Sequence, residues 1–222
     1  MNACLICGDK TFDNEFLCCD CMKFALKCVR RCPKCGSFLL AEEKEGCPAC
    51  RGKKIYFDKI YSLFIYSGAV SQLISVMKYG KVAHIAEVLG EYLAENAPSE
   101  LVGNRTVIFP PMRFLDKFLR SFNQAEIFAD RTAAKHGLKF DPKLLKKVRK
   151  TRHQAGLGYE ERIRNLTDAF SLTRTVKGED FLVVDDVCTT ASTINEIARI
   201  LKKNGASSVN GLTFARRTPY FA

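Results

Sequence analysis

The sequence predicts an α/β protein in which a mostly parallel sheet is flanked by helices and preceded by a small cysteine-rich domain. Three observations support this prediction. Short apolar runs alternate with segments of helical spacing from residue 55 onward, as in chains that build parallel sheets. One of these runs, 181–184, is apolar at every position, which is typical of a strand buried on both faces. Ten of the eleven cysteines lie in the first fifty residues.

The cysteines form an internal repeat that is typical of two zinc ribbons. They include four Cys-x-x-Cys pairs: Cys4/Cys7, Cys18/Cys21, Cys32/Cys35 and Cys47/Cys50. Ten residues separate the pairs of the first unit, and eleven separate those of the second. Four thiolates at such spacing can hold one tetrahedral Zn²⁺ between two tight turns, so we expect two structural zinc ions. Gly8 and Gly36 each follow a pair, where a positive φ is often needed.

Disulfide bonds are the alternative use of these cysteines. The chain opens without the charged and then apolar stretch of a signal peptide, so we expect a cytoplasmic protein with reduced, metal-binding thiols. Two such ribbons have too little apolar sequence for a core, and the metals should supply most of their stability. The sequence leaves open whether the pairs group sequentially or as a crossed brace. Cys19 and Cys28 are left over, and Cys19 could compete with Cys18 as a ligand.

The overall composition is that of a basic protein without a membrane span. The 222 residues are 47% hydrophobic, which suffices for a core, and no apolar run approaches the roughly 20 residues of a transmembrane helix. The formal net charge is +11, and counting eight thiolates and two Zn²⁺ leaves about +7. One basic stretch contains a single acid, Asp141, and is either solvated surface or a contact for nucleic acid. Its basic residues are Lys139, Lys143, Lys146, Lys147, Arg149, Lys150 and Arg152.

A shift in composition near residue 55 predicts two domains, a double zinc ribbon at 1–54 and an α/β domain at 55–222. After the ribbons, 55–67 alternates apolar and polar residues, which predicts a strand pair or an edge strand. Residues 71–77 and 83–94 have helical spacing and predict two amphipathic helices.

The rest of the α/β domain continues the alternation of strands and helices. The β-rich run 106–109 leads into two prolines, which predicts a strand followed by a ligand loop. A helix capped by Ser121 and ending at His136 follows. The basic segment 144–158 ends in two glycines and is expected to be a mobile flap, while 194–203 and 209–215 predict the last helix and the last strand.

The end of the strand 181–184 carries residues that suit a phosphorylated sugar. Asp185 and Asp186 follow the strand, and a hydroxyl-rich turn, 189–193, precedes the last helix. Open α/β sheets bind ligands at the carboxyl ends of their strands. Carboxylates there can hold sugar hydroxyls or Mg²⁺, and the amides and hydroxyls at a helix N-terminus can hold a phosphate.

P-loop proteins and simple helix caps show parts of the same pattern, but neither accounts for all of it. Aspartate pairs follow strands in P-loop proteins, but G-x-x-x-x-G-K-[ST] occurs nowhere in the sequence. A hydroxyl residue can merely cap a helix, which accounts for one of these residues and not for three threonines and a serine.

The residues 183–193, Val-Val-Asp-Asp-Val-Cys-Thr-Thr-Ala-Ser-Thr, closely resemble the phosphoribosyl pyrophosphate (PRPP) motif of type I phosphoribosyltransferases. This resemblance implies the type I phosphoribosyltransferase fold and Mg²⁺ bound together with PRPP. It also implies that Asp185 and Asp186 are the catalytic-site acids that hold the ribose hydroxyls. The 5′-phosphate would be held by Thr189, Thr190, Ala191, Ser192 and Thr193. Ala191 departs from the family, which usually has a glycine there because glycine tolerates unusual torsions and close ligand approach.

The middle of the chain resembles the ComF family, whose members join a cysteine-rich zinc domain to a type I phosphoribosyltransferase domain. The resemblance lies in 122–126 (Phe-Asn-Gln-Ala-Glu), 149–157, 161–165 and Ala169-Phe170, in that order. It implies that Pro111, Met112 and Arg113 form the pyrophosphate loop. The family signature would comprise Arg120, Phe122, Asn123 and Gln124, and the flap region would comprise Gln154, Arg162 and Asn165. Core packing is the simpler role for Phe122 and Phe170.

The resemblance implies two functions of different classes. ComF-like proteins are implicated in natural DNA transformation, where they act with a helicase on incoming single-stranded DNA. The ribbons and the basic stretch would then bind DNA or the partner, and the pocket would bind PRPP or a nucleotide. The protein is not expected to insert into a membrane. The alternative is an active phosphoribosyltransferase that transfers phosphoribosyl from PRPP to an unidentified acceptor. The residues of the sequence do not reveal what would select that acceptor.

Overall fold

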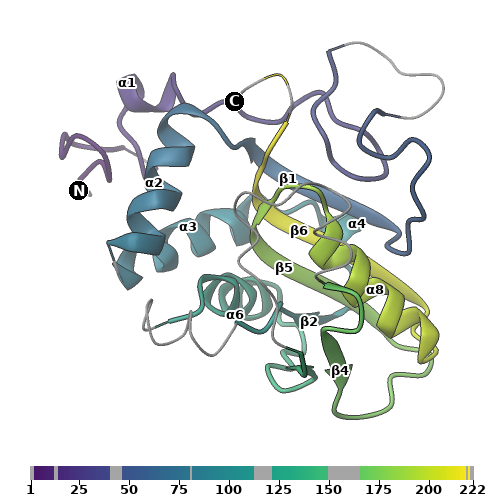
Figure 1. Ribbon diagram of the computed structural model, residues 1–222. Coiled ribbons are helices and arrows are strands. Elements are labelled where there is room, and N and C mark those ends of the chain that lie inside the picture. The colour runs from purple at the N-terminus through teal and green to yellow at the C-terminus, as the bar shows by residue number, and fades with distance from the viewer. Residues whose placement is uncertain are drawn as a thin grey trace.

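The computed structural model describes residues 3–12, 15–40, 47–80, 82–112, 122–149, 166–218 and Tyr220. Its main sheet is parallel throughout, in the order β1-β6-β5-β2 (Figure 1). The strands are β1 (Lys59–Ile65), β2 (Thr106–Ile108), β5 (Asp180–Cys188) and β6 (Ser208–Arg216). The predicted parallel sheet is therefore confirmed, and β1 is an edge strand as expected.

Helices cover both faces of this sheet. α2 (Gly68–Tyr79), α3 (Ala83–Glu95) and α6 (Gln124–His136) share one core with the sheet, and α8 (Ser192–Lys203) shares the other. The helices predicted at these places are confirmed, and α4 (Ser99–Val102) is a short additional one.

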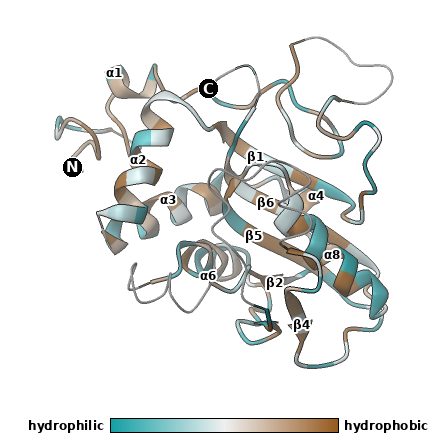
Figure 2. Cartoon of the chain, viewed as in Figure 1, coloured by the Kyte–Doolittle hydropathy of each residue, from teal (hydrophilic) through white to brown (hydrophobic). Residues whose placement is uncertain are grey.

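The apolar run of β5 supplies both cores because successive side chains of a strand point to opposite faces. Leu182 and Val184 belong to the core beneath α2, α3 and α6, whereas Phe181 and Val183 belong to the core beneath α8. Figure 2 shows β5 as hydrophobic and α8 as a mixture of hydrophilic and hydrophobic residues. The two-sided burial expected of 181–184 is thereby confirmed.

β5 is longer than its apolar run. Pairing with β6 continues to Cys188 opposite Arg216, so Asp185 and Asp186 lie within the strand rather than after it. On the other side, β2 ends with Ile108 opposite Val183. β5 therefore extends past the end of β2, and the two aspartates lie beyond the part of β5 that pairs with β2.

Two details of the middle segment differ from the prediction. The N-cap of α6 is Asn123, whose side chain accepts a hydrogen bond from the Ala125 amide at 3.2 Å, whereas Ser121 lies outside the described residues. The expected flap begins as packed structure: β3 (Leu145–Lys147) pairs antiparallel with β4 (Phe170–Leu172), and Leu144 and Leu145 are buried in the core beneath α8. Residues 150–158 of that flap lie outside the described part.

The two ribbons contribute to opposite cores. Here the first ribbon means residues 4–21 and the second ribbon means residues 32–50. In the first, Phe16 inserts beneath α3, with its ring centroid 4.7 Å from that of Tyr92. In the second, Leu39 joins the core beneath α8. The ribbons thus share cores with the rest of the chain, which the sequence did not indicate. That the metals supply most of their stability stays a prediction.

The second ribbon also covers the free edge of the sheet. The backbone amide of Ile60 in β1 donates to the Lys34 carbonyl at 2.8 Å, and the guanidinium of Arg31, which immediately precedes the ribbon, lies 4.0 Å from the ring centroid of Tyr61. Covering an edge strand prevents its unpaired backbone groups from pairing with another chain. Among the described residues, no helix has the length and apolar character needed to cross a bilayer.

Candidate functional site

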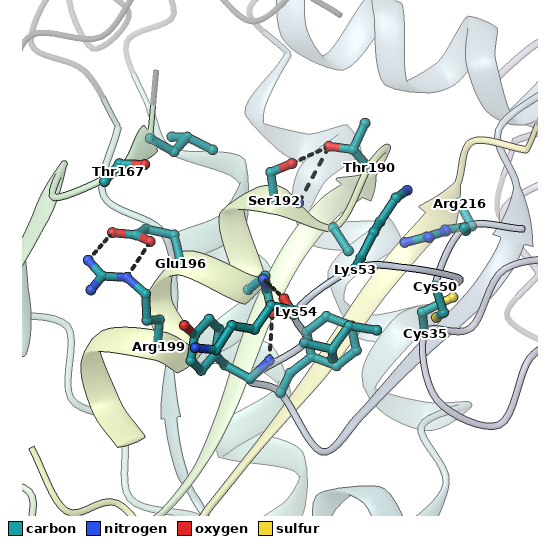
Figure 3. A pocket seen from close by; sticks show the side chains of 17 residues that line it. Cys35, Cys50, Lys53, Lys54, Thr167, Thr190, Ser192, Glu196, Arg199 and Arg216 are labelled. Carbon is teal, nitrogen blue, oxygen red and sulfur yellow. Dashed lines mark hydrogen bonds and ion pairs between the residues drawn. The ribbon is translucent and has the colours of Figure 1, made fainter. Parts of the chain in front are cut away.

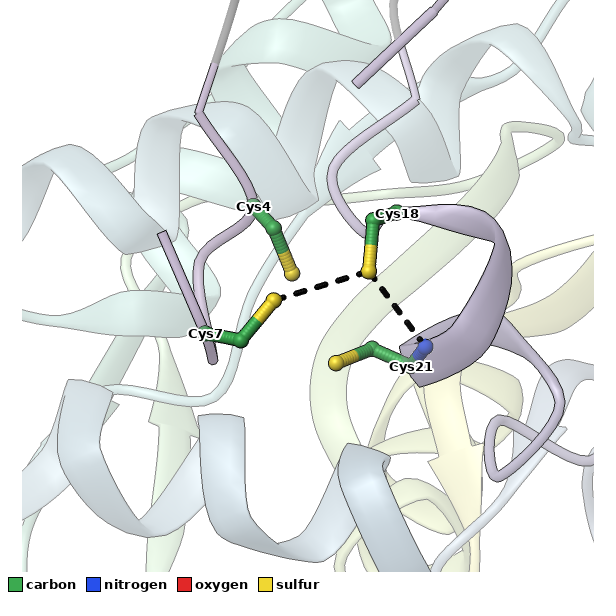
Figure 4. Close-up of side chains that lie close together, drawn as sticks. All are labelled: Cys4, Cys7, Cys18 and Cys21. Carbon is green, nitrogen blue, oxygen red and sulfur yellow. Dashed lines mark hydrogen bonds between the residues drawn. The ribbon is translucent and has the colours of Figure 1, made fainter. Parts of the chain in front are cut away.

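The cysteine pairs form two separate clusters. The sulfur atoms of Cys4, Cys7, Cys18 and Cys21 all lie within 4.8 Å of one another, and the same holds for Cys32, Cys35, Cys47 and Cys50. Figure 4 shows the four side chains of the first cluster converging. The pairs therefore group sequentially and not as a crossed brace. Cys19 is exposed outside the cluster, and the buried Cys28 thiol faces the Gly36 carbonyl at 3.6 Å.

The first turns of the two ribbons repeat the same backbone hydrogen bonds. The amide of Gly8 donates to the Cys4 carbonyl, and that of Gly36 donates to the Cys32 carbonyl, each at 3.0 Å. Both glycines have the positive φ that the sequence suggested, 80° and 67°. The second turns differ, because Cys18 caps a short helix, α1 (Cys19–Met22), whereas Cys47 begins a plain turn.

The thiols of each cluster differ in acidity, as expected when four sulfurs share a small volume. A hydrogen bond from Cys50 lowers the pKa of Cys35 to about 5 against the effect of burial, and the charge of Arg216 lowers it further. Burial raises the pKa of Cys47 to about 11. A metal that needs four thiolates must therefore displace protons from the others. Four converging sulfurs are the donor set of a structural zinc site, so the residues fit that ion.

The aspartate pair lies on β5 beside α2. Asp186 is buried and its Oδ2 forms an ion pair with the Lys78 Nζ at 2.8 Å. Asp185 accepts a hydrogen bond from the Asp186 amide at 2.9 Å. Burial and then the charge of Asp186 raise the pKa of Asp185 to about 7, while the charge of Lys78 opposes this shift. No sequence signal pointed to Lys78, which stands at the end of an ordinary amphipathic helix.

Residues 189–193 connect β5 to α8 and are called the phosphate loop here, because the sequence predicts that they hold a phosphate. Ala191 is the N-cap of α8 and has φ 62° and ψ 8°, the left-handed conformation that favours glycine. The substitution of alanine for the usual glycine thus falls on a residue that needs glycine-like torsions. The hydroxyls of Thr190 and Ser192 lie 2.7 Å apart and hydrogen-bond to each other. Thr189 and Thr193 are partly exposed on either side of them.

The start of the expected pyrophosphate loop lies at the same end of the sheet. Pro111 and Met112 are partly buried and follow β2, the neighbour of β5, and the Asn123 side chain donates to the Pro110 carbonyl at 3.2 Å. Gln124 is buried at the start of α6. Phe122 and Phe170 pack against the two cores, as predicted. The other predicted residues lie outside the described part: Arg113, Arg120, Gln154, Arg162 and Asn165.

A cavity of about 330 Å³ lies between the phosphate loop and the second ribbon (Figure 3). Neither aspartate is among the described residues that line it. The loop contributes residues 190–192, and the basic residues of the lining are Lys53, Lys54, Arg199 and Arg216. Sequence reasoning missed this wall of the site, because the ribbon and the loop lie far apart along the chain.

The basic stretch that the sequence singled out lies on the surface beside β3. Lys139, Lys143, Lys146 and Arg149 are exposed, and Lys150 and Arg152 lie outside the described residues. Asp141 forms an ion pair with Arg174 at 2.9 Å. The single acid of the stretch is therefore occupied by a cation from elsewhere in the chain.

Comparisons with known proteins identify one matching domain family and several similar proteins. Residues 123–218 match the phosphoribosyl transferase domain family. The chain is 30% identical over 201 residues to DNA utilization protein YhgH of Salmonella typhimurium, covering 87% of each chain. It is 29% identical over 224 residues to competence protein F of Haemophilus influenzae, covering 96% of each. A hypoxanthine phosphoribosyltransferase structure from Staphylococcus aureus is 14% identical, with a TM-score of 0.38 over 57% of this chain and 62% of that one. The domain match confirms the predicted fold class.

Proposed function

We propose two roles for this chain, which belongs to the ComF family. The first is to handle incoming single-stranded DNA in natural transformation. The second is to bind PRPP in its α/β domain, 55–222. The names of its relatives, competence protein F and DNA utilization protein, support the first part. One observation carries the second part. Asp185, Asp186 and the phosphate loop follow one another along β5 and into α8, at the carboxyl end of the parallel sheet and past the last residue of β2.

Each part of PRPP has a partner of suitable chemistry. Asp185 and Asp186 accept hydrogen bonds from the ribose hydroxyls, and the loop residues Thr189, Thr190, Ala191, Ser192 and Thr193 surround the 5′-phosphate. Pro111, Met112 and Arg113 take the pyrophosphate. Mg²⁺ enters with PRPP and neutralises its phosphates, since Mg²⁺ prefers substrate oxygens and water over an all-protein site.

Calorimetry with PRPP and Mg²⁺ tests this ligand. We expect the metal-loaded protein to bind. Asp185→Asn together with Asp186→Asn should weaken binding at least tenfold, because each substitution replaces an oxygen that accepts hydrogen bonds with an amide nitrogen that cannot. The exposed pair Asp130→Asn and Glu126→Gln removes two charges from α6 as a matched control. If the unaltered protein gives no heat of binding, PRPP is not its ligand.

The ribbon domain, 1–54, holds two structural zinc ions and supports partner or DNA contacts in this proposal. The cytoplasm, where thiols stay reduced, is the expected location. A competence helicase is the expected protein partner. DNA binding is assigned to the exposed basic residues beside β3, because phosphate contacts by lysine and arginine supply most of the sequence-independent affinity for DNA.

A charge-matched pair of variants tests the DNA contact. Lys143→Ala with Lys146→Ala should weaken binding of single-stranded DNA and reduce its salt dependence, since two phosphate contacts are lost. Lys177→Ala with Lys203→Ala removes the same charge from exposed positions outside that stretch of sequence. Equal affinity of the two double variants, measured by fluorescence anisotropy over a range of salt, would count against the assigned surface.

Phosphoribosyl transfer is the second candidate function. The raised pKa of Asp185 beside a phosphate loop favours it, because perturbed acids gather at active sites. A screen of bases and amines should then detect pyrophosphate release that Asp185→Asn with Asp186→Asn abolishes. PRPP binding without turnover for any acceptor would leave the binding role alone.

A further inference from the structure

The phosphate loop is attached to the second ribbon at its first end through Arg216. Arg216 is 1% exposed, and its guanidinium Nη1 donates to the thiol of Cys188, the residue that precedes the loop. The backbone supports the same contact, because the Arg217 amide donates to the Cys188 carbonyl at 2.9 Å. The position of Cys188, and of the loop that follows it, is therefore tied to a buried cation.

The other side of Arg216 faces the second cluster. Cys35 and Cys50 line the same cavity as Arg216, and Figure 3 shows them next to it. The Nε of Arg216 has no hydrogen-bond partner among the described residues. A buried guanidinium needs anionic partners, and zinc with four thiolates has a net charge of −2.

The second end of the loop is attached to the ribbon through Asn195, in the first turn of α8. Its Oδ1 accepts from the Tyr56 amide at 2.8 Å, and its Nδ2 donates to the Lys54 carbonyl at 3.0 Å. Lys54 and Tyr56 belong to the segment that leaves the second ribbon after Cys50. The Asn195 amide also donates to the carbonyl of Ala191, inside the loop, at 2.8 Å. One end of the loop is thus held by Arg216, which faces the second cluster, and the other end contacts the exit segment of the ribbon directly.

The first cluster has no comparable position. Cys4 and Cys18 belong to the core beneath α2, α3 and α6, on the opposite face of the sheet from α8. Cys32, Cys35 and Cys47 belong to the core beneath α8, next to the loop. The two zinc sites, though similar in sequence, therefore stand in different relations to the phosphate loop.

We propose that the metal-loaded second cluster supports the phosphate loop. When this cluster holds its metal, Arg216 and Asn195 fix the loop in the phosphate-binding conformation. The first cluster does not affect the loop. Arg216 and Asn195 are positioning residues, since they act through Cys188 and Ala191. This inference rests on the proposed role of the loop. The affinity of the protein for a phosphate ligand should therefore depend on which of the two metal sites is filled.

Matched cysteine variants of the full chain test the proposal. Cys50→Ser disables the second cluster, and Cys7→Ser disables the first, each verified as the loss of one zinc per chain by metal analysis. We expect Cys50→Ser to accelerate hydrogen exchange of residues 189–195 and to weaken binding of PRPP with Mg²⁺, each about tenfold. Cys7→Ser should leave both within about twofold. Equal effects of the two variants, or none from Cys50→Ser, would overturn the proposal.

The exchange measurement separates this inference from the proposed ligand. If the unaltered protein fails to bind PRPP, the ligand assignment is wrong. Faster hydrogen exchange of the loop in Cys50→Ser, but not in Cys7→Ser, would still show that the second cluster supports the loop. Unchanged loop exchange in that variant contradicts the support whether or not PRPP binds.

Cobalt substitution tests the role of Arg216 itself. In the Cys7→Ser background only the second cluster binds Co²⁺, whose thiolate charge-transfer absorption reports the charge around the sulfurs. We expect Arg216→Gln to shift this absorption and to accelerate loop exchange, and Arg216→Lys to restore both in part. Asn195→Ala should accelerate loop exchange without shifting the absorption. An absorption that is the same in the Arg, Gln and Lys forms would refute the contact between Arg216 and the cluster.

Discussion

At the scale of single residues, Ala191 is the clearest departure from ordinary backbone geometry in the site. Its φ of 62° places an L-residue in the left-handed region, at a cost of roughly 1 kcal/mol. Ala191→Gly removes that cost but adds flexibility to the unfolded chain, so we expect the free energy of unfolding to rise by up to about 1 kcal/mol.

Urea unfolding of the zinc-loaded protein measures this change. The control is Ala134→Gly at an exposed position of α6, where glycine should lower stability by about 1 kcal/mol. Equal losses at the two positions would contradict the strain assigned to Ala191. If the alanine also restricts the loop, the glycine variant should bind PRPP more tightly than the unaltered chain.

Asp185 should make stability depend on pH in an unusual direction. Its pKa in the folded protein is about 7, above the ordinary 3.8. A carboxyl with a raised pKa contributes its full stability below about pH 4, and that contribution is lost as the pH rises through 7. Asp185→Asn removes the charge and keeps an oxygen for the Asp186 amide. Its stability relative to the unaltered chain should therefore increase by about 2 kcal/mol between about pH 5 and pH 8.

Urea unfolding without PRPP at the two pH values measures this difference. Asp130→Asn makes the same change at an exposed position of α6 and provides the comparison. A relative stability of Asp185→Asn that does not change with pH would mean that the carboxyl is not destabilised by its surroundings.

At the scale of elements, Gly36 joins the second ribbon to the edge of the sheet. A Cβ added there would lie 2.6 Å from the Ile60 carbonyl oxygen of β1, and φ is already positive. Gly36→Ala should therefore cost about 3 kcal/mol of unfolding free energy, combining backbone strain with displacement of the ribbon.

Gly8 provides the matched control, because it occupies the same turn of the first ribbon. Its φ is 80°, but an added Cβ would meet nothing within 4 Å. Gly8→Ala should cost only about 1 kcal/mol, from the torsion alone. Thermal unfolding of both zinc-loaded variants compares them, and similar losses would show that contact with β1 adds nothing to the strain.

The strands and helices that the sequence predicted are those with strong local patterns. The apolar run in β5 and the helical spacing of α2, α3 and α8 each determine their element locally. The end of β5 could not be predicted, because Asp185, Asp186 and Cys188 are held in the strand by pairing with β6. The three-residue strands β3 and β4 are too short for any periodicity to reveal.

The candidate site was predicted in part for the same reason. The aspartates and the loop are contiguous in sequence and form a recognisable motif. Lys78 and Arg216 reach the site from α2 and β6, and only the folded chain brings them there. Cysteine spacing predicted two metal clusters, but which face of the sheet each joins depends on Phe16 and Leu39, which resemble any other apolar residues.

At the scale of the whole molecule, the two clusters differ in their access to solvent. Each cluster has one half-buried thiol, Cys21 in the first and Cys50 in the second, but the first also contains the exposed Cys7, whereas the other three thiols of the second are buried. A chelator reaches exposed sulfurs first, so zinc should leave in two phases, the faster from the first cluster. Lower pH should accelerate both phases, because the freed thiolates take up protons and metal binding releases them.

A chromogenic chelator that reports free zinc follows this release directly. Cys7→Ser should lack the fast phase, and Cys50→Ser should lack the slow phase. The two variants therefore assign each phase to its cluster. The partly loaded state after the fast phase should retain an ordered phosphate loop, since its remaining zinc lies beside Arg216 on the face of α8. A single phase of release, or loss of PRPP binding together with the fast phase, would mean that the two faces of the sheet respond to metal as one unit.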